Sequence, residues 1–550
     1  MITQDSIDQV LETLPLRYSG PGGALAILQN GKLLGQRVWG YADVAKRIHM
    51  DPDTRMPICS ITKQFICALL LDLKQNPTPA MTARGTDIDA QFEDKLRETL
   101  HPDIFAAHPE LSVQHLCDMQ SGLRDYWAMT ALWGAEPEGE FRLARQYAPM
   151  LTRTKSFQFA PGTEYSYCNV NFHVLGRVIE RVAGGELGGL LRERVLAPAG
   201  MDTAVLWPSN ATLPGPCIGY EGTEQTGYVA AVNNMEWSGD AGLVASLKDM
   251  IAWETHLHRL YAEGPDNWYA RAASKPTTFA DGTTPAMYHF GLIHEFADGV
   301  HTVGHSGALR GWRSHRRHAP EAGISVIVLL NHEASVGPAV EYAFQALLQK
   351  SAPESPIVEP TPAWEGSFLD RDTQLVVRVR PGSKRGQLVL AYAGADETLR
   401  LTDPSHGETA WMKARIDGDV LHVHRIKENR KLEARRLVSR PSSFQDASLT
   451  GDYRCEEVDS VFHCWGEAGL LYGEFDGYLG RGTATVMRYV GDDVWVLTCP
   501  RGLDAPAPGD WTVVFRRGED GAVEGFTMGC WLARRVEFVK LKSAIHLEDI

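Results

Sequence analysis

The sequence predicts an α+β protein in which a mixed unit of helices and strands precedes two small all-β units. Three observations lead to this prediction. Residues 1–349 combine strand-like runs with helical periodicity, residues 350–362 contain four prolines, and residues 363–550 hold short alternating apolar runs separated by Gly, Asp and Pro. A period of two is typical of half-buried strands, and proline cannot continue a helix. We therefore expect three folded units, with a linker after the first.

The first unit opens with a predicted hairpin. Two apolar runs in "GGALAILQNGKLLGQRVWGYAD" flank Asn30-Gly31, a dipeptide that suits a tight turn because both residues tolerate a positive φ. Apolar residues then recur at spacings of three and four in residues 60–75 and 171–185, which predicts two helices. The strand-like "ISVIVLL" and the helix-like "PAVEYAFQALLQK" complete the unit.

The remainder of the chain reads as strands throughout. Runs such as "LVVRVR", "QLVLAYA" and "WTVVFRR" alternate with turn residues, and a second break near 439–448 divides the tail. Residues 363–440 and 441–550 are therefore predicted as two β modules, each a small barrel or a sandwich.

Composition excludes several classes of function. The net charge is -15, from 54 basic and 69 acidic side chains, and no run of Lys and Arg is long enough to follow a phosphate backbone, so nucleic acid is not an expected partner. The N-terminal sequence has no apolar core of signal-peptide length, and no window reaches the roughly 18 to 20 apolar residues of a membrane span. We expect a cytoplasmic protein.

The cysteines indicate neither disulfides nor a metal site. Nine of them are scattered along the chain without a CxxC pair. The histidines of "HEFADGVH" are also too far apart in sequence for a helical zinc motif. The sequence therefore predicts free thiols, no metal and no cofactor.

Ser60 and Lys63, in "CSITKQF", form the only Ser-x-x-Lys of the chain. If a helix begins near Ser60, the two side chains share one face and the amine lies beside the hydroxyl. Such a serine is a candidate nucleophile. By itself the spacing fits equally well a helix-capping serine followed by a solvated lysine.

Tyr167 and Asn169, in "YSYCNVNF", form the only Tyr-x-Asn, and they lie between a turn signal and a predicted helix. Packing and helix capping would explain them, but a phenol beside a lysine can also act as a base or a proton shuttle.

The third candidate is His305-Ser306-Gly307, in "GHSGALRGWR". His289-Phe290-Gly291 has the same pattern. We prefer His305 because a strand and a helix follow it, whereas His289 opens the preceding strand. A lone strand histidine can also be purely structural.

Taken in this order and at this spacing, the three motifs resemble those of the penicillin-recognising serine hydrolases. With "PICSITKQF" and "SGLRDYW", the His-x-Gly form is most similar to the D-stereospecific aminopeptidases, and the resemblance extends over nearly the full chain. It implies a β-lactamase-like catalytic domain at 1–349, a linker at 350–362 and β-barrel domains at 363–440 and 441–550.

The resemblance also implies roles for the motif residues. Ser60 would be the nucleophile that forms an acyl-enzyme, and Lys63 and Tyr167 would move its proton. Asn169 would orient the substrate amide, and His305 would complete the polar cluster. The N–H of Ser60 and one on the strand of Gly307 would hold the oxyanion.

Two further residues are candidates for binding substrate. Arg313 matches a basic residue near the site of these relatives, although it can equally be a surface charge. A loop of the last domain, at 499–511, would reach the cleft, and Asp504 on it would meet the substrate's ammonium. Ile293 stands where the relatives carry a polar residue, which bears on specificity.

The predicted function is removal of N-terminal D-residues, D-Ala first, from small peptides, amides or esters, by a homodimer as the resemblance implies. β-Lactams are expected as possible inhibitors. The alternatives are a D,D-carboxypeptidase, a β-lactamase-like amidase or an esterase with the same three motifs, and a non-catalytic penicillin-recognising binding protein.

Overall fold

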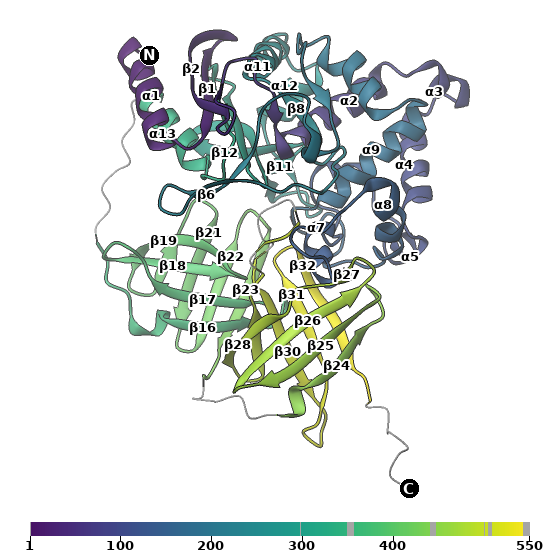
Figure 1. Ribbon diagram of the computed structural model, residues 1–550, viewed down its shortest axis with the longest axis vertical. Coiled ribbons are helices and arrows are strands. Elements are labelled where there is room, and N and C mark those ends of the chain that lie inside the picture. Colours follow the sequence, from purple (N-terminus) through teal and green to yellow (C-terminus); the bar gives the residue numbers. More distant parts are fainter. Residues whose placement is uncertain are drawn as a thin grey trace.

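The computed structural model describes residues 2–297, 299–348, 357–439, 447–499, 501–503 and 509–542. It consists of a mixed α and β domain and two β-barrels (Figure 1). Most of the predicted linker and all of Asp504 lie outside the described residues.

An eight-stranded antiparallel sheet forms the frame of the first domain, in the order β11-β12-β13-β14-β15-β1-β2-β3. The predicted hairpin is confirmed, because Asn30 and Gly31 have φ values of 50° and 72° between its first two strands. The strands are β1 (Gly22–Gln29), β2 (Lys32–Asp43), β3 (Ile48–His49), β11 (Tyr288–His289), β12 (Leu292–Ala297), β13 (Val300–Leu309), β14 (Trp312–Ala319) and β15 (Ile324–Leu330).

The helices of this domain cover both faces of the sheet (Figure 1). Leu25 and Ile27 of β1 pack against the first and last helices, whereas Ala24 and Ala26 face the larger core on the other side. This alternation is the period of a strand. The helices are α1 (Gln4–Arg17), α2 (Thr62–Gln75), α3 (Pro79–Arg84), α4 (Ile88–Thr99), α5 (Pro102–Ala107), α6 (Val113–Cys117), α7 (Tyr126–Leu132), α8 (Leu143–Thr152), α9 (Asn169–Ala183), α10 (Leu187–Leu191), α11 (Leu247–Ala262), α12 (Trp268–Ser274) and α13 (Gly337–Leu348).

Short strands complete the domain around the main sheet. They are β4 (Met56–Pro57), β5 (Val205–Leu206) and β8 (Leu243–Ala245) in one sheet, β6 (Tyr220–Thr223) with β7 (Gly227–Ala230), and β9 (Thr277–Thr278) with β10 (Pro285–Ala286).

The tail forms two closed barrels, which resolves the choice between barrel and sandwich. The first barrel closes through pairing of its first and last strands. Its strands are β16 (Gly366–Asp370), β17 (Val376–Pro381), β18 (Gln387–Tyr392), β19 (Ala395–Asp403), β20 (His406–Glu408), β21 (Met412–Asp417), β22 (Val420–Arg425) and β23 (Arg430–Arg436).

The second barrel closes because β25 pairs with both β24 and β26, and β27 is attached at its edge. Its strands are β24 (Gly451–Cys455), β25 (Ser460–Glu467), β26 (Leu470–Gly477), β27 (Gly480–Arg481), β28 (Thr485–Gly491), β29 (Val494–Leu497), β30 (Trp511–Arg517), β31 (Val523–Cys530) and β32 (Ala533–Lys540).

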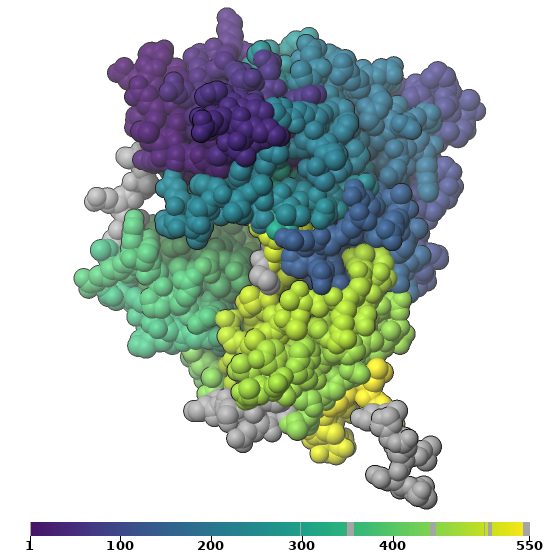
Figure 2. Space-filling view, in the orientation of Figure 1, coloured from purple at the N-terminus to yellow at the C-terminus, as the bar shows by residue number. Residues whose placement is uncertain are grey.

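The two barrels relate differently to the first domain. The first barrel has a buried core of its own, whereas the second shares one continuous apolar core with the helices of the first domain. Figure 2 shows the second barrel, in yellow-green, directly against the blue part of that domain. The second barrel is therefore held to the first domain by a shared apolar core, and not by a linker alone.

The free thiols are confirmed, since all nine cysteines are unpaired and eight of them are buried. Among the described helices, none is both long and apolar enough to cross a bilayer.

Candidate active site

Ser60 lies in a one-turn 3-10 helix, η1 (Cys59–Ile61), between β4 and α2. The residue before it, Cys59, is fully buried and has a φ of 54°, a left-handed conformation that is rare for a residue other than glycine. Thr62 holds the turn by donating to the Cys59 carbonyl at 2.7 Å, and Ser314 donates to the Ile58 carbonyl at 2.8 Å. The sharp turn leaves Ser60 partly exposed at the N-terminal end of α2.

Lys63 lies beneath Ser60 with no exposed surface. Its Nζ atom is 3.0 Å from the Ser60 hydroxyl, 2.8 Å from Asn169 Oδ1 and 2.6 Å from the Asp240 carbonyl. Burial lowers the pKa of Lys63 to about 8, against the opposing attraction of Asp240 and Asp125. The predicted pairing of Ser60 with Lys63 on one face is therefore present.

Asn169 is oriented by Asp125, which caps α7. Asp125 accepts hydrogen bonds from the backbone N–H of Asn169 at 3.0 Å and from its Nδ2 at 2.8 Å. A carboxylate accepts from the amide nitrogen, so the amide oxygen of Asn169 is left facing Lys63. Burial raises the pKa of Asp125 to about 7. Asn169 is the first residue of α9 and not its cap.

Tyr167 lines the same space. Its ring centroid lies 4.9 Å from Lys63 Nζ. Burial raises the pKa of the Tyr167 phenol well above its ordinary value, while a hydrogen bond with Ser60 lowers it. The phenol therefore stays protonated near neutral pH and contacts the hydroxyl as a neutral group.

His305 is buried on β13. Its Nδ1 contacts the Ser306 carbonyl, which can only accept, so the proton sits on Nδ1 and Nε2 accepts from the Tyr288 hydroxyl at 3.0 Å. The pKa of His305 is lowered to about 3, mainly by burial and to a smaller extent by repulsion from Lys63. The imidazole is thus neutral near pH 7. The competing His289 lies instead against Asp118 at 3.0 Å.

Gly307 allows β13 to lie against the turn that carries Ser60. A Cβ atom at this position would be 2.6 Å from the Ile58 carbonyl and 2.7 Å from the Cys59 Cβ. In the described chain β12 pairs with β13 only up to Gly304, so the strand beyond it has an open edge beside Ser60.

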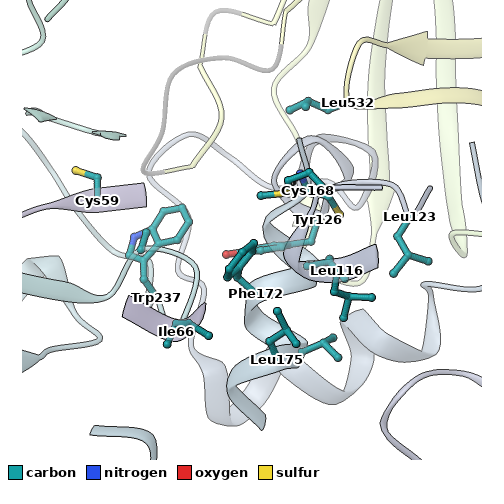
Figure 3. Close-up of a cluster of buried hydrophobic side chains, with 14 of the residues drawn as sticks. Cys59, Ile66, Leu116, Leu123, Tyr126, Cys168, Phe172, Leu175, Trp237 and Leu532 are labelled. Atoms are coloured by element: carbon teal, nitrogen blue, oxygen red, sulfur yellow. Dashed lines mark hydrogen bonds between the residues drawn. The ribbon is translucent and has the colours of Figure 1, made fainter. Parts of the chain in front are cut away.

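A pocket of about 230 Å³ opens over Ser60. The described residues that line it are five polar ones, Ser60, Tyr167, Asn169, His305 and Ser306, with Trp127, Trp237, Trp531 and the aliphatic Ala241, Ile293, Ala308 and Leu309. Since His305 is neutral, none of the described lining side chains carries a charge near pH 7. Much of the surrounding core is apolar as well (Figure 3).

Of the two further predicted binding residues, Arg313 does not line this pocket. Arg313 donates to the carbonyls of Leu309 and Trp312 and lies 3.7 Å from Glu333, lining a neighbouring cavity. Asp504 lies outside the described residues.

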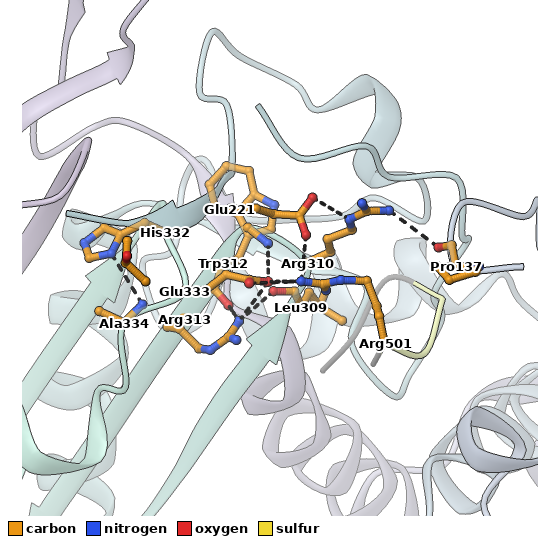
Figure 4. A network of polar contacts seen from close by, with 12 residues as sticks. Pro137, Glu221, Leu309, Arg310, Trp312, Arg313, His332, Glu333, Ala334 and Arg501 are labelled. Carbon is orange, nitrogen blue, oxygen red and sulfur yellow. Dashed lines mark hydrogen bonds and ion pairs between the residues drawn. The ribbon is translucent and has the colours of Figure 1, made fainter. Parts of the chain in front are cut away.

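A network of charges beside the site joins the second barrel to the first domain (Figure 4). Arg501 lies 2.6 Å from Glu221 on β6 and 3.0 Å from Glu333, which follows β15. Arg310, at the end of β13, approaches the same Glu221 at 2.7 Å. The predicted loop 499–511 is therefore anchored at Arg501 to segments that flank β13.

Several site residues were not predicted. Asp125 stands within the quoted "SGLRDYW", and its place just before a helix is a capping signal. Asp240, which accepts from Tyr126 at 2.6 Å, and Tyr288 carry no local signal. Trp531 comes from the last domain, in a turn between two strands.

Comparisons with known proteins show which family the chain belongs to. Residues 7–350 match the family described as Beta-lactamase, and residues 357–539 match D-aminopeptidase, domain B. A D-aminopeptidase of Brucella canis is 41% identical over 537 residues, covering 98% of this chain and 99% of the relative. A D-aminopeptidase of Brucella anthropi is 40% identical over 540 residues, covering 98% of each chain.

Solved structures resemble the chain in fold. The octameric penicillin-binding protein homologue from Pyrococcus abyssi covers 78% of this chain and 99% of its own, with a TM-score of 0.52 at 18% identity.

Proposed function

The chain belongs to the D-aminopeptidase family of serine hydrolases, and we propose that it removes N-terminal D-residues from peptides, amides and esters, with Ser60 as nucleophile. The observation that carries the proposal is the 3.0 Å contact between Ser60, which lines a pocket, and the fully buried Lys63. A lysine without a role in the site would keep its ammonium group in contact with water, because burial of an ammonium is costly.

Lys63 is proposed as the base that activates Ser60. A neutral amine has two N–H donors and one lone pair. Asn169 Oδ1 and the Asp240 carbonyl can only accept, so they engage the two donors. The lone pair is then left for the third neighbour, the Ser60 hydroxyl, whose proton it takes as the oxygen attacks the substrate carbonyl.

Tyr167 is proposed as the relay to the leaving group. Its raised pKa keeps it a neutral hydroxyl, which can accept a proton from the Lys63 side and donate another to the departing amine. The bond from the carbonyl carbon to nitrogen breaks as the amine is protonated, and the acyl group remains on Ser60. Water then attacks the ester and releases the D-amino acid.

The oxyanion would be held by backbone donors. Ser60 lies at the start of α2, whose dipole favours negative charge, and the open edge of β13 beyond Gly304 offers backbone groups beside it. Such a strand edge also suits an extended peptide substrate.

The lining of the pocket favours this function over a D,D-carboxypeptidase or a β-lactamase. A D,D-carboxypeptidase or a β-lactamase acts on a substrate with a free carboxylate, which needs a cationic partner in a partly closed site. The described lining side chains supply none, because His305 is neutral, and Lys63 below Ser60 is proposed to act as a neutral base. The α-ammonium of the proposed substrate needs a carboxylate instead, and this is the role proposed for Asp504.

Finer features of the function are also part of the proposal. Asp504 is expected to meet the substrate's α-ammonium, and D-alanine is expected as the preferred N-terminal residue. We further propose that the protein is cytoplasmic and that it forms a homodimer, the latter as the resemblance implies.

The acyl-enzyme can be tested directly. The protein is mixed with a D-alanine ester, quenched in acid and digested with trypsin, which cuts after Arg55 and after Lys63. The peptide at 56–63 should gain the mass of one alanyl group, and Ser60→Ala should abolish the gain. Rapid turnover of the ester without any adduct, even at millisecond quench times, would contradict acylation of Ser60.

A further inference from the structure

The second barrel inserts a hairpin tip into the first domain. Cys530 pairs with Ala533, so Trp531 and Leu532 form a two-residue turn between β31 and β32. Leu532 has no exposed surface and belongs to the core shared with the first domain (Figure 3). Its carbonyl accepts from the backbone N–H of Asp125 at 3.2 Å and from Gln158 Nε2 at 3.3 Å.

A short chain of hydrogen bonds connects the buried Leu532 to the proposed catalytic groups. Asp125, which donates its N–H to Leu532, also holds Asn169 with its carboxylate, and Asn169 in turn accepts from Lys63. The position of the hairpin tip is therefore fixed relative to Ser60.

Charged contacts hold the base of the hairpin as well. Glu164, which lies in the loop just before Tyr167, contacts Arg430 of the first barrel and Arg534 of the second, the latter at 2.8 Å. Arg124 donates to the Arg534 carbonyl at 3.0 Å. All three domains thus meet at the base of this hairpin.

Trp531 uses this fixed position to line the pocket over Ser60. Its ring also packs against the core of the first barrel and lies close to Gly509, where an added Cβ would be 3.2 Å from its Cδ1. With neighbours on several sides, the indole forms a fixed wall. Trp127 and Ile293 provide further apolar surface in the same pocket.

We propose that Trp531 is a specificity-determining residue and that the pocket takes large apolar D-side chains, such as those of D-leucine and D-phenylalanine, in addition to D-alanine. This inference rests on the proposed function. Apolar cavities of about 150 Å³ bind benzene, and the pocket here measures about 230 Å³. Besides the five polar residues, three tryptophans and four aliphatic side chains line it, and no described lining side chain carries a charge near pH 7.

The methyl group of a D-alanine substrate leaves most of this apolar surface in contact with water, whereas the side chain of D-leucine or D-phenylalanine covers more of it. One methylene in an apolar pocket changes kcat/KM by roughly 10- to 200-fold. Removing the indole should therefore lower kcat/KM more for substrates with large side chains than for D-alanine substrates. The ratio of the two kcat/KM values reports this difference and does not depend on how much of the protein is active.

The test compares D-alanine, D-leucine and D-phenylalanine p-nitroanilides on the full-length wild-type protein and on Trp531→Ala. We expect the wild type to cleave the D-leucine and D-phenylalanine substrates as well as the D-alanine substrate. Trp531→Ala should lower the ratio of D-phenylalanine to D-alanine kcat/KM by about 10-fold or more, mainly through KM. Trp531→Phe, which keeps an aromatic ring, should give an intermediate ratio.

Trp465→Ala is the matched control. Trp465 lies on β25 of the same barrel, stacked on Tyr472 with ring centroids 5.7 Å apart, and its loss should leave the ratio unchanged. Cleavage of D-alanine alone by the wild type, or an unchanged ratio in both Trp531 variants, would overturn the inference while leaving the proposed function intact. No cleavage of any D-amide would overturn the proposed function and this inference together.

Discussion

The Nζ atom of Lys63 lies 3.0 Å from the Oγ atom of Ser60, although Lys63 has no exposed surface. Burial lowers the pKa of this lysine to about 8, so a substantial fraction of it is neutral in mildly basic solution. The consequences of this contact can be measured.

The first prediction concerns pH. Because the neutral amine is the proposed base, the rate of Ser60 modification should rise with pH through an apparent pKa near 8. Phenylmethylsulfonyl fluoride is a suitable probe because it carries no titratable group. Unlike a substrate with an α-ammonium, it adds no titration of its own to the pH profile. A rate that stays flat from pH 6.5 to 9.5 would contradict the role of Lys63.

Asp125→Asn should move that profile. The negative charge of Asp125 raises the pKa of Lys63, so its removal should shift the rise to lower pH. The inactivation profiles of the two proteins, recorded in the same buffers, make the comparison. An unchanged or higher apparent pKa in the variant would show that the titrating group is not Lys63.

Ser60→Ala should abolish turnover of every D-amide and leave the fold intact. The variant loses one partly exposed hydroxyl, so circular dichroism and the melting temperature should match the wild type closely. Residual activity at the wild-type level would end the assignment of Ser60 as nucleophile.

Gly307→Ala should damage catalysis through geometry. Its Cβ would be 2.6 Å from the Ile58 carbonyl and 2.7 Å from the Cys59 Cβ, so β13 must move away from the turn that holds Ser60. Displacements of this kind cost about 100-fold in rate, and we expect kcat/KM to fall by at least that factor.

Gly337→Ala is the control for this substitution, because nothing lies within 4 Å of a Cβ added there. We expect wild-type kcat/KM for the control. If Gly307→Ala is also as active as the wild type, the close approach of β13 to Ser60 has no catalytic importance.

Arg501→Met should weaken the contact between the second barrel and the first domain. Arg501 is 19% exposed and lies between Glu221 and Glu333, so its loss leaves two carboxylates with fewer partners. We expect a loss of roughly 1–3 kcal/mol, between the values for exposed and for buried ion pairs, measured as a lower melting temperature.

Arg516→Met provides the comparison. Arg516 is 46% exposed and pairs with Glu537 on the surface of the same barrel, so its removal should change stability by less than about 1 kcal/mol. Equal melting temperatures of the two variants would argue against an anchoring role for Arg501.

The sequence predicted much of this site because its motifs report local geometry. A Ser-x-x-Lys spacing at a helix start brings Ser60 beside Lys63, and the structure brings Tyr167 and Asn169 to the same place. The barrels followed from alternating apolar runs, although closure into barrels depends on pairing between distant strands.

Contacts between distant segments were beyond prediction. The neutrality of His305 results from burial among residues far apart in sequence, and the seat of Trp531 results from packing of the second barrel onto the first domain. Neither burial nor domain packing leaves a periodic pattern that a single sequence reveals.

The most direct test of the proposed function is side-by-side hydrolysis of D-alanine, L-alanine and N-acetyl-D-alanine p-nitroanilides. The proposal predicts cleavage of the free D-form, with little or none of the L-form or of the N-acetylated form. Equal cleavage of the D- and L-forms, or preferential cleavage of the N-acetylated form, would contradict a D-stereospecific aminopeptidase.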